Sequence, residues 1–200
     1  MKIAFYGGSF NPPHAGHARC AQAAADFLLP DLFLIVPDYL PPHKLLAENS
    51  PSPEARLEMC RIAFRSVAAA RVSDLELQRV GRSYTSDTII ELRLKYPDDE
   101  LLLVIGSDML FTFPEWHEYR FILSQCTLVV AARMVGESEE LSRAVQRLRE
   151  AERAKILLLS YEPYPASSTE IRKALAEGKS PAGLDEEVYR YIRENGYYLE

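Results

Sequence analysis

The chain has 200 residues, of which 48% are hydrophobic, and a formal net charge of −6 at pH 7. This length and composition support one sizeable hydrophobic core, with room for a second small lobe. The negative charge argues against a general nucleic-acid-binding surface, although a local basic pocket would still accept phosphates, so a small-molecule substrate is favoured.

The three cysteines, Cys20, Cys60 and Cys126, are widely separated and form no CxxC or histidine-paired pattern. This spacing favours neither a disulfide framework nor a zinc site and is typical of a reducing compartment. Only four apolar residues separate Lys2 from Gly7, too few for a secretory signal, and no apolar run approaches the ~20 residues of a membrane span. We therefore expect a cytoplasmic protein that is not exported.

Short apolar segments alternate with amphipathic ones along the chain. Strands are predicted at 3–6, 32–36, 72–77, 101–105, 127–132 and 155–159, of which 72–77 has the alternating pattern of an edge strand. Helices are predicted over 18–29, 52–67, 86–96, 138–154 and 180–198, with a short one ending at 123 and another opening at 167. This alternation indicates an α/β fold with a Rossmann-like, doubly wound, mostly parallel sheet. We expect a single domain over 1–200, with a small C-terminal helical part from about 166 to 200.

Residues 7–17 read GGSFNPPHAGH and join the first predicted strand to the first helix. Gly7 and Gly8 allow a ligand to approach the backbone, and the helix start that follows presents unpaired N–H groups to an anion. His14 and His17 are three residues apart, so we expect both imidazoles on one helix face, as two cation-capable donors to a polyphosphate. The segment lacks the third glycine of the dinucleotide fingerprint and the Lys-Ser/Thr pair of a P-loop.

Other polar segments follow strands or open helices. The proline-rich segment 38–53 contains PPHK at 41–44 and is predicted to be a mobile cover over a second substrate. The apolar strand 101–105 ends at Gly106-Ser107-Asp108, where ligands bind in open α/β sheets. Residues 113–119 hold the single tryptophan, and SSTEIR at 167–172 matches a capping box.

Two helices are interpreted as structural: the helix opened by Ser52, which we expect merely to cover the sheet, and the amphipathic surface helix over 138–154. Thr85 or Ser86 is predicted to cap the helix over 86–96. The chain has no Ser-His-Asp order, nucleophile elbow or catalytic cysteine motif, so hydrolase chemistry is disfavoured.

The opening segment resembles the G-G-[ST]-F-[DN]-P-x-H-x-G-H signature of the nucleotidyltransferase superfamily, in the form found in nicotinate mononucleotide adenylyltransferases. Four further segments are similar to that family in the same order: 41–44, 83–88, 105–119 and 167–172. The chain departs at Asn11, where many members have Asp, and at Ala166, where Ile is usual. The first departure puts a metal contact at Asn11 in doubt.

The resemblance implies adenylyl transfer from ATP to nicotinate mononucleotide, giving deamido-NAD and pyrophosphate in NAD biosynthesis, with Mg²⁺ accompanying ATP. It assigns no protein side chain to the metal and implies neither a nucleic-acid nor a membrane partner. The implied catalytic residues are His14, His17, Lys44 and Arg172. The implied ATP-binding residues are Gly7, Gly8, Ser9, Phe10, His14, Gly16, His17, Gly106, Asp108, Arg133, Ser167, Ser168, Thr169 and Arg172. Those implied for nicotinate mononucleotide are Gly8, Ser9, Lys44, Tyr84, Thr85, Trp116 and His117.

Two alternatives stay open. Another small nucleotidyltransferase, acting on nicotinamide mononucleotide or pantetheine phosphate, would share the opening motif, although the pantetheine-phosphate family generally has Thr at the position of His14. A non-catalytic nucleotide-sensing module is disfavoured by the two histidines, Lys44 and Arg172, because a sensor needs affinity but not transition-state donors.

Overall fold

The computed structural model describes residues 1–42, 45–47, 49–133 and 139–199. Its six-stranded sheet has the order β3-β2-β1-β4-β5-β6, and all neighbouring strands are parallel. The strands are β1 (Lys2–Gly8), β2 (Leu32–Pro37), β3 (Ala70–Val72), β4 (Glu100–Gly106), β5 (Thr127–Arg133) and β6 (Ile156–Tyr161). The strand order reverses between β1 and β4, which is where doubly wound sheets open a crevice for ligands. The predicted doubly wound α/β fold is confirmed.

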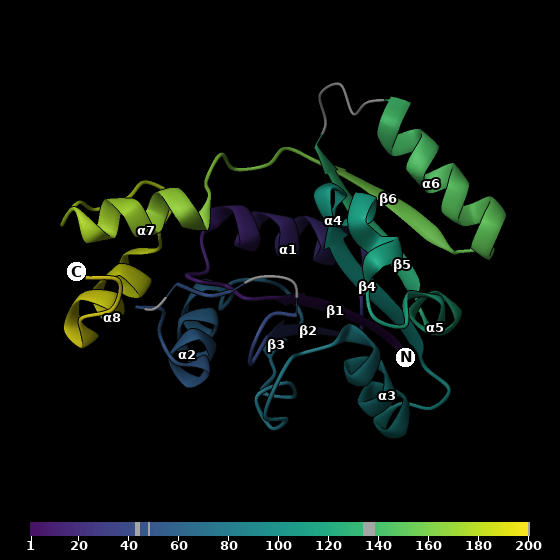
Figure 1. Cartoon of the computed structure of the whole chain (residues 1–200), viewed down its shortest axis with the longest axis horizontal. Coiled ribbons are helices and arrows are strands. Elements are labelled where there is room, and N and C mark those ends of the chain that lie inside the picture. Colours follow the sequence, from purple (N-terminus) through teal and green to yellow (C-terminus); the bar gives the residue numbers. More distant parts are fainter. Residues whose placement is uncertain (43–44, 48, 134–138, 200) are drawn as a thin grey trace.

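Helices cover both faces of this sheet (Figure 1). They are α1 (Ala15–Leu28), α2 (Pro53–Ala63), α3 (Thr85–Lys95), α4 (Ser107–Thr112), α5 (Tyr119–Gln125), α6 (Glu139–Glu152), α7 (Ser168–Ala176) and α8 (Glu186–Asn195), with a 3₁₀ turn, η1 (Phe113–Glu115). Helices α1 and α2 share one buried cluster with the sheet, whereas α3, α5 and α6 pack in a second cluster on the opposite face. No helix in the described part of the chain has the length and apolar character needed to cross a membrane.

The C-terminal helices α7 and α8 lie together with α2 at one end of the molecule (Figure 1). They form their own buried cluster, in which Met59 of α2 meets Ile171 of α7 and Ile192 of α8. Burial of these apolar side chains holds the first turn of α7 beside the end of β1, where Ser168 Oγ donates a hydrogen bond of 3.1 Å to the carbonyl of Pro12.

The prediction of an edge strand over 72–77 is wrong beyond Val72. Strand β3 ends there, and the backbone N–H groups of Leu77 and Gln78 both donate to the carbonyl of Asp74, which closes a turn. Leu75 and Glu76 are both buried, so the alternating pattern reflects a packed turn rather than a half-exposed strand.

Two local predictions about helices also need correction. Helix α4 was not predicted, because its six residues are too few to show a helical period. Helix α3 begins after Tyr84, and no side chain caps it, so neither Thr85 nor Ser86 has the predicted capping role.

Candidate active site

A cavity of about 1090 Å³ opens at the carboxyl ends of the central strands. Most residues singled out in the sequence line it: Gly7, Gly8, Ser9, Phe10, His14, Gly16, His17, Tyr84, Thr85, Gly106, Asp108, Trp116, His117, Ser168 and Arg172. Ser167 and Thr169 stand beside it in the first turn of α7 without lining it. Lys44 lies outside the described residues, and so does the side chain of Arg133, the last residue of β5.

The two histidines form the start of α1. His14 is the N-cap, and its Nδ1 accepts a hydrogen bond of 3.1 Å from the backbone N–H of Gly16. His17 Nδ1 accepts one of 3.3 Å from the backbone N–H of His14, which completes a capping box made of imidazoles. Because both Nδ1 atoms are acceptors, a neutral ring of either residue carries its hydrogen on Nε2.

His14 is uncharged at neutral pH. Only 8% of the residue is exposed, and burial lowers the pKa of its imidazole to about 4. The expectation of two cation-capable donors is therefore wrong for His14, which offers a neutral N–H donor instead. The backbone N–H groups at the start of α1 supply partial positive charge at the same place, and this charge does not depend on a titratable group.

Glycine is required at position 16 by the imidazole of His14. A Cβ on Gly16 would lie 2.9 Å from Cε1 and 3.0 Å from Nδ1 of that ring. The ring can therefore fold back onto the helix start only because position 16 has no side chain.

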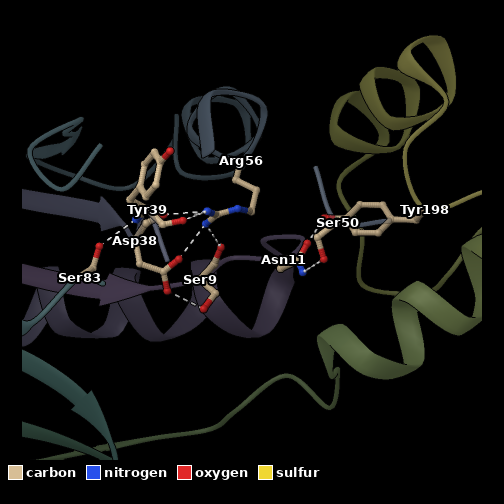
Figure 2. A network of polar contacts seen from close by, with 8 residues as sticks. All are labelled: Ser9, Asn11, Asp38, Tyr39, Ser50, Arg56, Ser83 and Tyr198. Atoms are coloured by element: carbon tan, nitrogen blue, oxygen red, sulfur yellow. Dashed lines mark hydrogen bonds and ion pairs between the residues drawn. The ribbon is translucent and has the colours of Figure 1, made fainter. Parts of the chain in front are cut away.

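Two residues of α7 bind the backbone of the opening motif. Arg172 Nη1 donates a hydrogen bond of 2.8 Å to the carbonyl of Asn11, and Ser168 binds the carbonyl of Pro12. The side chain of Asn11 points the other way, accepting from the hydroxyl of Tyr198 at 2.5 Å and donating to Ser50 Oγ at 2.8 Å (Figure 2). The amide of Asn11 is thus occupied by protein partners.

Aromatic rings lie at another part of the cavity wall. The rings of Tyr84 and His117 are in contact, with centroids 4.5 Å apart. Trp116 packs on the buried ring of Phe113, with centroids 5.0 Å apart, and also lines the cavity. Trp116 is therefore half-buried against the core and also part of the cavity wall.

The predicted cover, 38–53, contributes to the cavity wall in its described part. Pro41, Pro42, Leu45 and Leu46 line the cavity, and Ser50 is bound by Asn11. Closure of this loop over a substrate stays a prediction.

Several cavity residues were missed from the sequence. Asp38 directly follows β2, and its position at a strand end was a usable signal. Glu76 is buried in the turn after β3, where its Oε1 accepts a hydrogen bond of 2.5 Å from Thr88. Burial raises the pKa of the Glu76 carboxyl to about 7, against the lowering effect of Thr88, Ser83 and Arg79.

A family profile described as cytidylyltransferase-like matches residues 5–174, a span that includes β1 through most of α7. The chain belongs to the cytidylyltransferase-like family. The matched span contains every part of the cavity wall described above, so the turn after β1 and the α7 contacts belong to the shared domain.

Curated relatives within the cytidylyltransferase-like family match the chain over nearly its full length. A probable nicotinate-nucleotide adenylyltransferase from Geobacter sulfurreducens is 36% identical, covering 99% of this chain and 98% of the relative. One from Lachnoclostridium phytofermentans is 33% identical and covers 99% of both chains. A solved structure of Plasmodium falciparum nicotinic acid mononucleotide adenylyltransferase complexed with NaAD has a TM-score of 0.79 at 18% identity, over 98% of this chain and 96% of that one. That last likeness is one of fold.

Proposed function

We propose that this protein transfers the adenylyl group of ATP to nicotinate mononucleotide, releasing pyrophosphate and forming deamido-NAD. The observation that carries the proposal is the imidazole pair at the start of α1, whose ring centroids lie 3.8 Å apart in the wall of the cavity. Both full-length curated relatives carry the name of this activity. The three thiols, none of which forms a disulfide, support a cytoplasmic location.

The size of the cavity supports two substrates. Its volume of about 1090 Å³ exceeds the roughly 300–1,000 Å³ typical of a site for one drug-sized ligand. One part of the wall holds the imidazoles and the first turn of α7, and another holds Tyr84, Trp116 and His117. We assign the first part to the phosphates of ATP and the second to the pyridine nucleotide.

In the proposed mechanism, an oxygen of the mononucleotide phosphate attacks the α-phosphorus of ATP. The bond from that phosphorus to the bridging oxygen breaks, and pyrophosphate leaves with the electron pair. Such a transfer depends on positioning and charge stabilisation rather than on a covalent nucleophile. The Nε2–H groups of His14 and His17 and the N-terminus of α1 supply donors to the transferring group, while Arg172 and the backbone of the first turn of α7, at Ser168, hold the departing phosphates.

Mg²⁺ fits this site as a partner of the triphosphate. Among the described residues, the carboxylates that line the cavity are Asp38, Glu76 and Asp108. Asp38 is bound by Arg56 and Ser9, and Glu76 by Thr88, so Asp108 would hold the water shell of the metal. When bound, the metal screens the charge of the phosphates during transfer.

A pyrophosphate-release assay tests the proposed function. Purified protein is given MgATP with nicotinate mononucleotide, nicotinamide mononucleotide, pantetheine phosphate or no acceptor. We expect release to be fastest with nicotinate mononucleotide and on the order of 10² slower in the His17→Ala variant, which controls for contaminating enzymes. Preference for another acceptor would assign the chain to that nucleotidyltransferase, and nucleotide binding without release would indicate a sensing module.

A further inference from the structure

Arg56 is a buried cation in a helix that the sequence describes as mere cover for the sheet. It lies in the first turns of α2, and none of its surface is exposed. Burying a guanidinium has a large desolvation cost, and an apolar side chain of similar size is often equally stabilising or more so. Cover for the sheet therefore does not explain a cation at this position.

The guanidinium of Arg56 binds two segments at once (Figure 2). One is the turn that follows β1, residues 9–14, which we call the phosphate turn, and the other is the end of β2. Arg56 Nη1 donates to the carbonyl of Ser9 at 2.8 Å and to Asp38 Oδ1 at 3.0 Å. Nη2 donates to the carbonyls of Asp38 at 2.8 Å and Tyr39 at 2.9 Å. The other oxygen of Asp38 accepts from Ser9 Oγ at 2.6 Å, so the backbone and the hydroxyl of Ser9 are both fixed.

The same network reaches the segment that precedes Tyr84 and Thr85. The backbone N–H of Tyr39 donates to Ser83 Oγ at 2.9 Å, and the backbone N–H of Ser83 donates to the carbonyl of Leu40, also at 2.9 Å. Figure 2 shows Tyr39 and Asp38 between Ser83 on one side and Ser9 on the other. The Arg56 side chain and the backbone of Tyr39 and Leu40 thus connect the wall assigned to ATP phosphates with the wall assigned to the pyridine nucleotide.

We propose that Arg56 is a positioning residue that sets the distance between the phosphate turn and the Ser83–Thr85 segment. It thereby aligns the attacking phosphate with the α-phosphorus, and it contacts neither substrate. The alignment depends on the planar fork of arginine, because a lysine ammonium cannot donate to four oxygens in one plane. This inference rests on the proposed function for the identity of the two substrates.

The first test compares Arg56→Lys with Arg61→Lys. Arg61 is on the same helix but exposed, and it pairs with Glu58 at 2.8 Å, so its variant is the matched control. We expect Arg56→Lys to lower kcat by about 10- to 100-fold, because small displacements of reacting groups have effects of this size. The lower rate should persist at saturating concentrations of both substrates. Arg61→Lys should have the kcat of wild type.

Ser83→Ala tests the connection between the two walls of the cavity without removing the buried guanidinium. It removes the acceptor of the Tyr39 N–H and a hydrogen bond to the Glu76 carboxyl, and it leaves every contact of the guanidinium in place. We expect the dissociation constant of nicotinate mononucleotide to rise at least about threefold, with the KM of ATP unchanged. Trp116, the single tryptophan, lines the cavity, so its fluorescence reports mononucleotide binding without turnover.

The outcomes separate this inference from the proposed function. If wild type releases pyrophosphate and folded Arg56→Lys keeps its kcat within about threefold, the positioning role is overturned. If Arg56→Lys does not fold, unchanged mononucleotide binding in Ser83→Ala overturns it instead. If wild type does not release pyrophosphate, only the proposed function is contradicted. The binding measurement on Ser83→Ala still decides whether the Ser83 contact positions the mononucleotide.

Discussion

The imidazole rings of His14 and His17 stack at the start of α1, with centroids 3.8 Å apart and ring planes inclined by 31°. Each ring accepts a backbone N–H through Nδ1, so the two side chains hold one another and the helix start in a single arrangement. Burial lowers the pKa of the His14 imidazole to about 4, so this ring is neutral at pH 7. The pair therefore presents ordered donors to an anion at little reorganisation cost.

Replacing His17 with alanine should remove a donor to the transferring group. We expect a loss of roughly 3 kcal/mol of transition-state stabilisation, or on the order of 10² in kcat, with a smaller change in KM. Steady-state kinetics of pyrophosphate release measure this, and His17→Gln serves as a variant that keeps a side-chain donor. A folded His17→Ala variant within about threefold of wild-type kcat would contradict the role.

Gly16→Ala should displace the His14 ring while leaving the imidazole itself in the chain. The added Cβ would meet the ring at 2.9 Å and the carbonyl of Tyr164 at 3.3 Å. We expect kcat to fall at least about tenfold, because the His14 donor would no longer be in place. The control is Arg19→Ala on the same helix, whose exposed side chain pairs only with Glu162 at 3.4 Å among the described residues. Equal kcat in Gly16→Ala and wild type would mean that the position of His14 is unimportant.

Glu76 should make the protein less stable as pH rises. Its carboxyl has an ordinary pKa of 4.5, but burial raises that value to about 7 in the folded state. Between these values the unfolded state loses its proton first, so the free energy of unfolding falls with increasing pH, by at most about 3 kcal/mol. The loss is complete above pH 7 and absent below pH 4.5.

Glu76→Gln tests this pH dependence, because the amide still accepts from Thr88 and does not ionise. We expect the variant to exceed wild type in Tm by about 5 °C at pH 8 and to match it near pH 4.5. Glu194→Gln, at an exposed position of α8, provides the control at both pH values. A Tm difference that does not change with pH would argue against the raised pKa.

Trp116→Ala should weaken both mononucleotides while preserving most of their ratio. An indole attracts a pyridinium ring by about 0.5 to 2 kcal/mol, whether the ring carries a carboxylate or a carboxamide. We expect the acid to be preferred by about 10² or more, because backbone N–H groups near Tyr84 and His117 satisfy a carboxylate and mismatch a carboxamide.

Values of kcat/KM for both mononucleotides, on wild type and on Trp116→Ala, measure this preference. Thermal unfolding must be followed in parallel, because Trp116 also packs on Phe113. Equal values on wild type would refute assignment to the nicotinate substrate. A ratio that collapses in the variant would place selectivity on the indole.

Removal of divalent metal should abolish turnover but not mononucleotide binding. We expect EDTA in excess over Mg²⁺ to stop pyrophosphate release and added MgCl₂ to restore it, because the charge of the triphosphate needs screening during transfer. Trp116 fluorescence with nicotinate mononucleotide alone is the control, because we expect the binding of this substrate to need no screening of a triphosphate. Undiminished turnover in the chelator would exclude the metal requirement.

Short sequence patterns predicted those parts of the site whose conformation depends on residues close together in the chain. Strand β1 includes Gly7 and Gly8, and residues 9–14 then turn and open α1, because proline and a capping side chain act within a few residues of themselves. Five strands were predicted from short apolar runs, which are typical of a parallel sheet. The turn at Asp74 was missed because its alternating residues have the same pattern as a strand.

The sequence by itself determined most strands of the sheet, the turn between β1 and α1 and the order of the motifs around it, because each depends on neighbouring residues. Only the tertiary structure decided which distant groups share a low-dielectric interior. Asn11 meets Tyr198 across 187 positions, and Arg56 meets Ser9 across 47. Burial then made His14 neutral and raised the pKa of Glu76. Desolvation and long-range hydrogen bonding depend on how the whole chain packs, and no short segment encodes them.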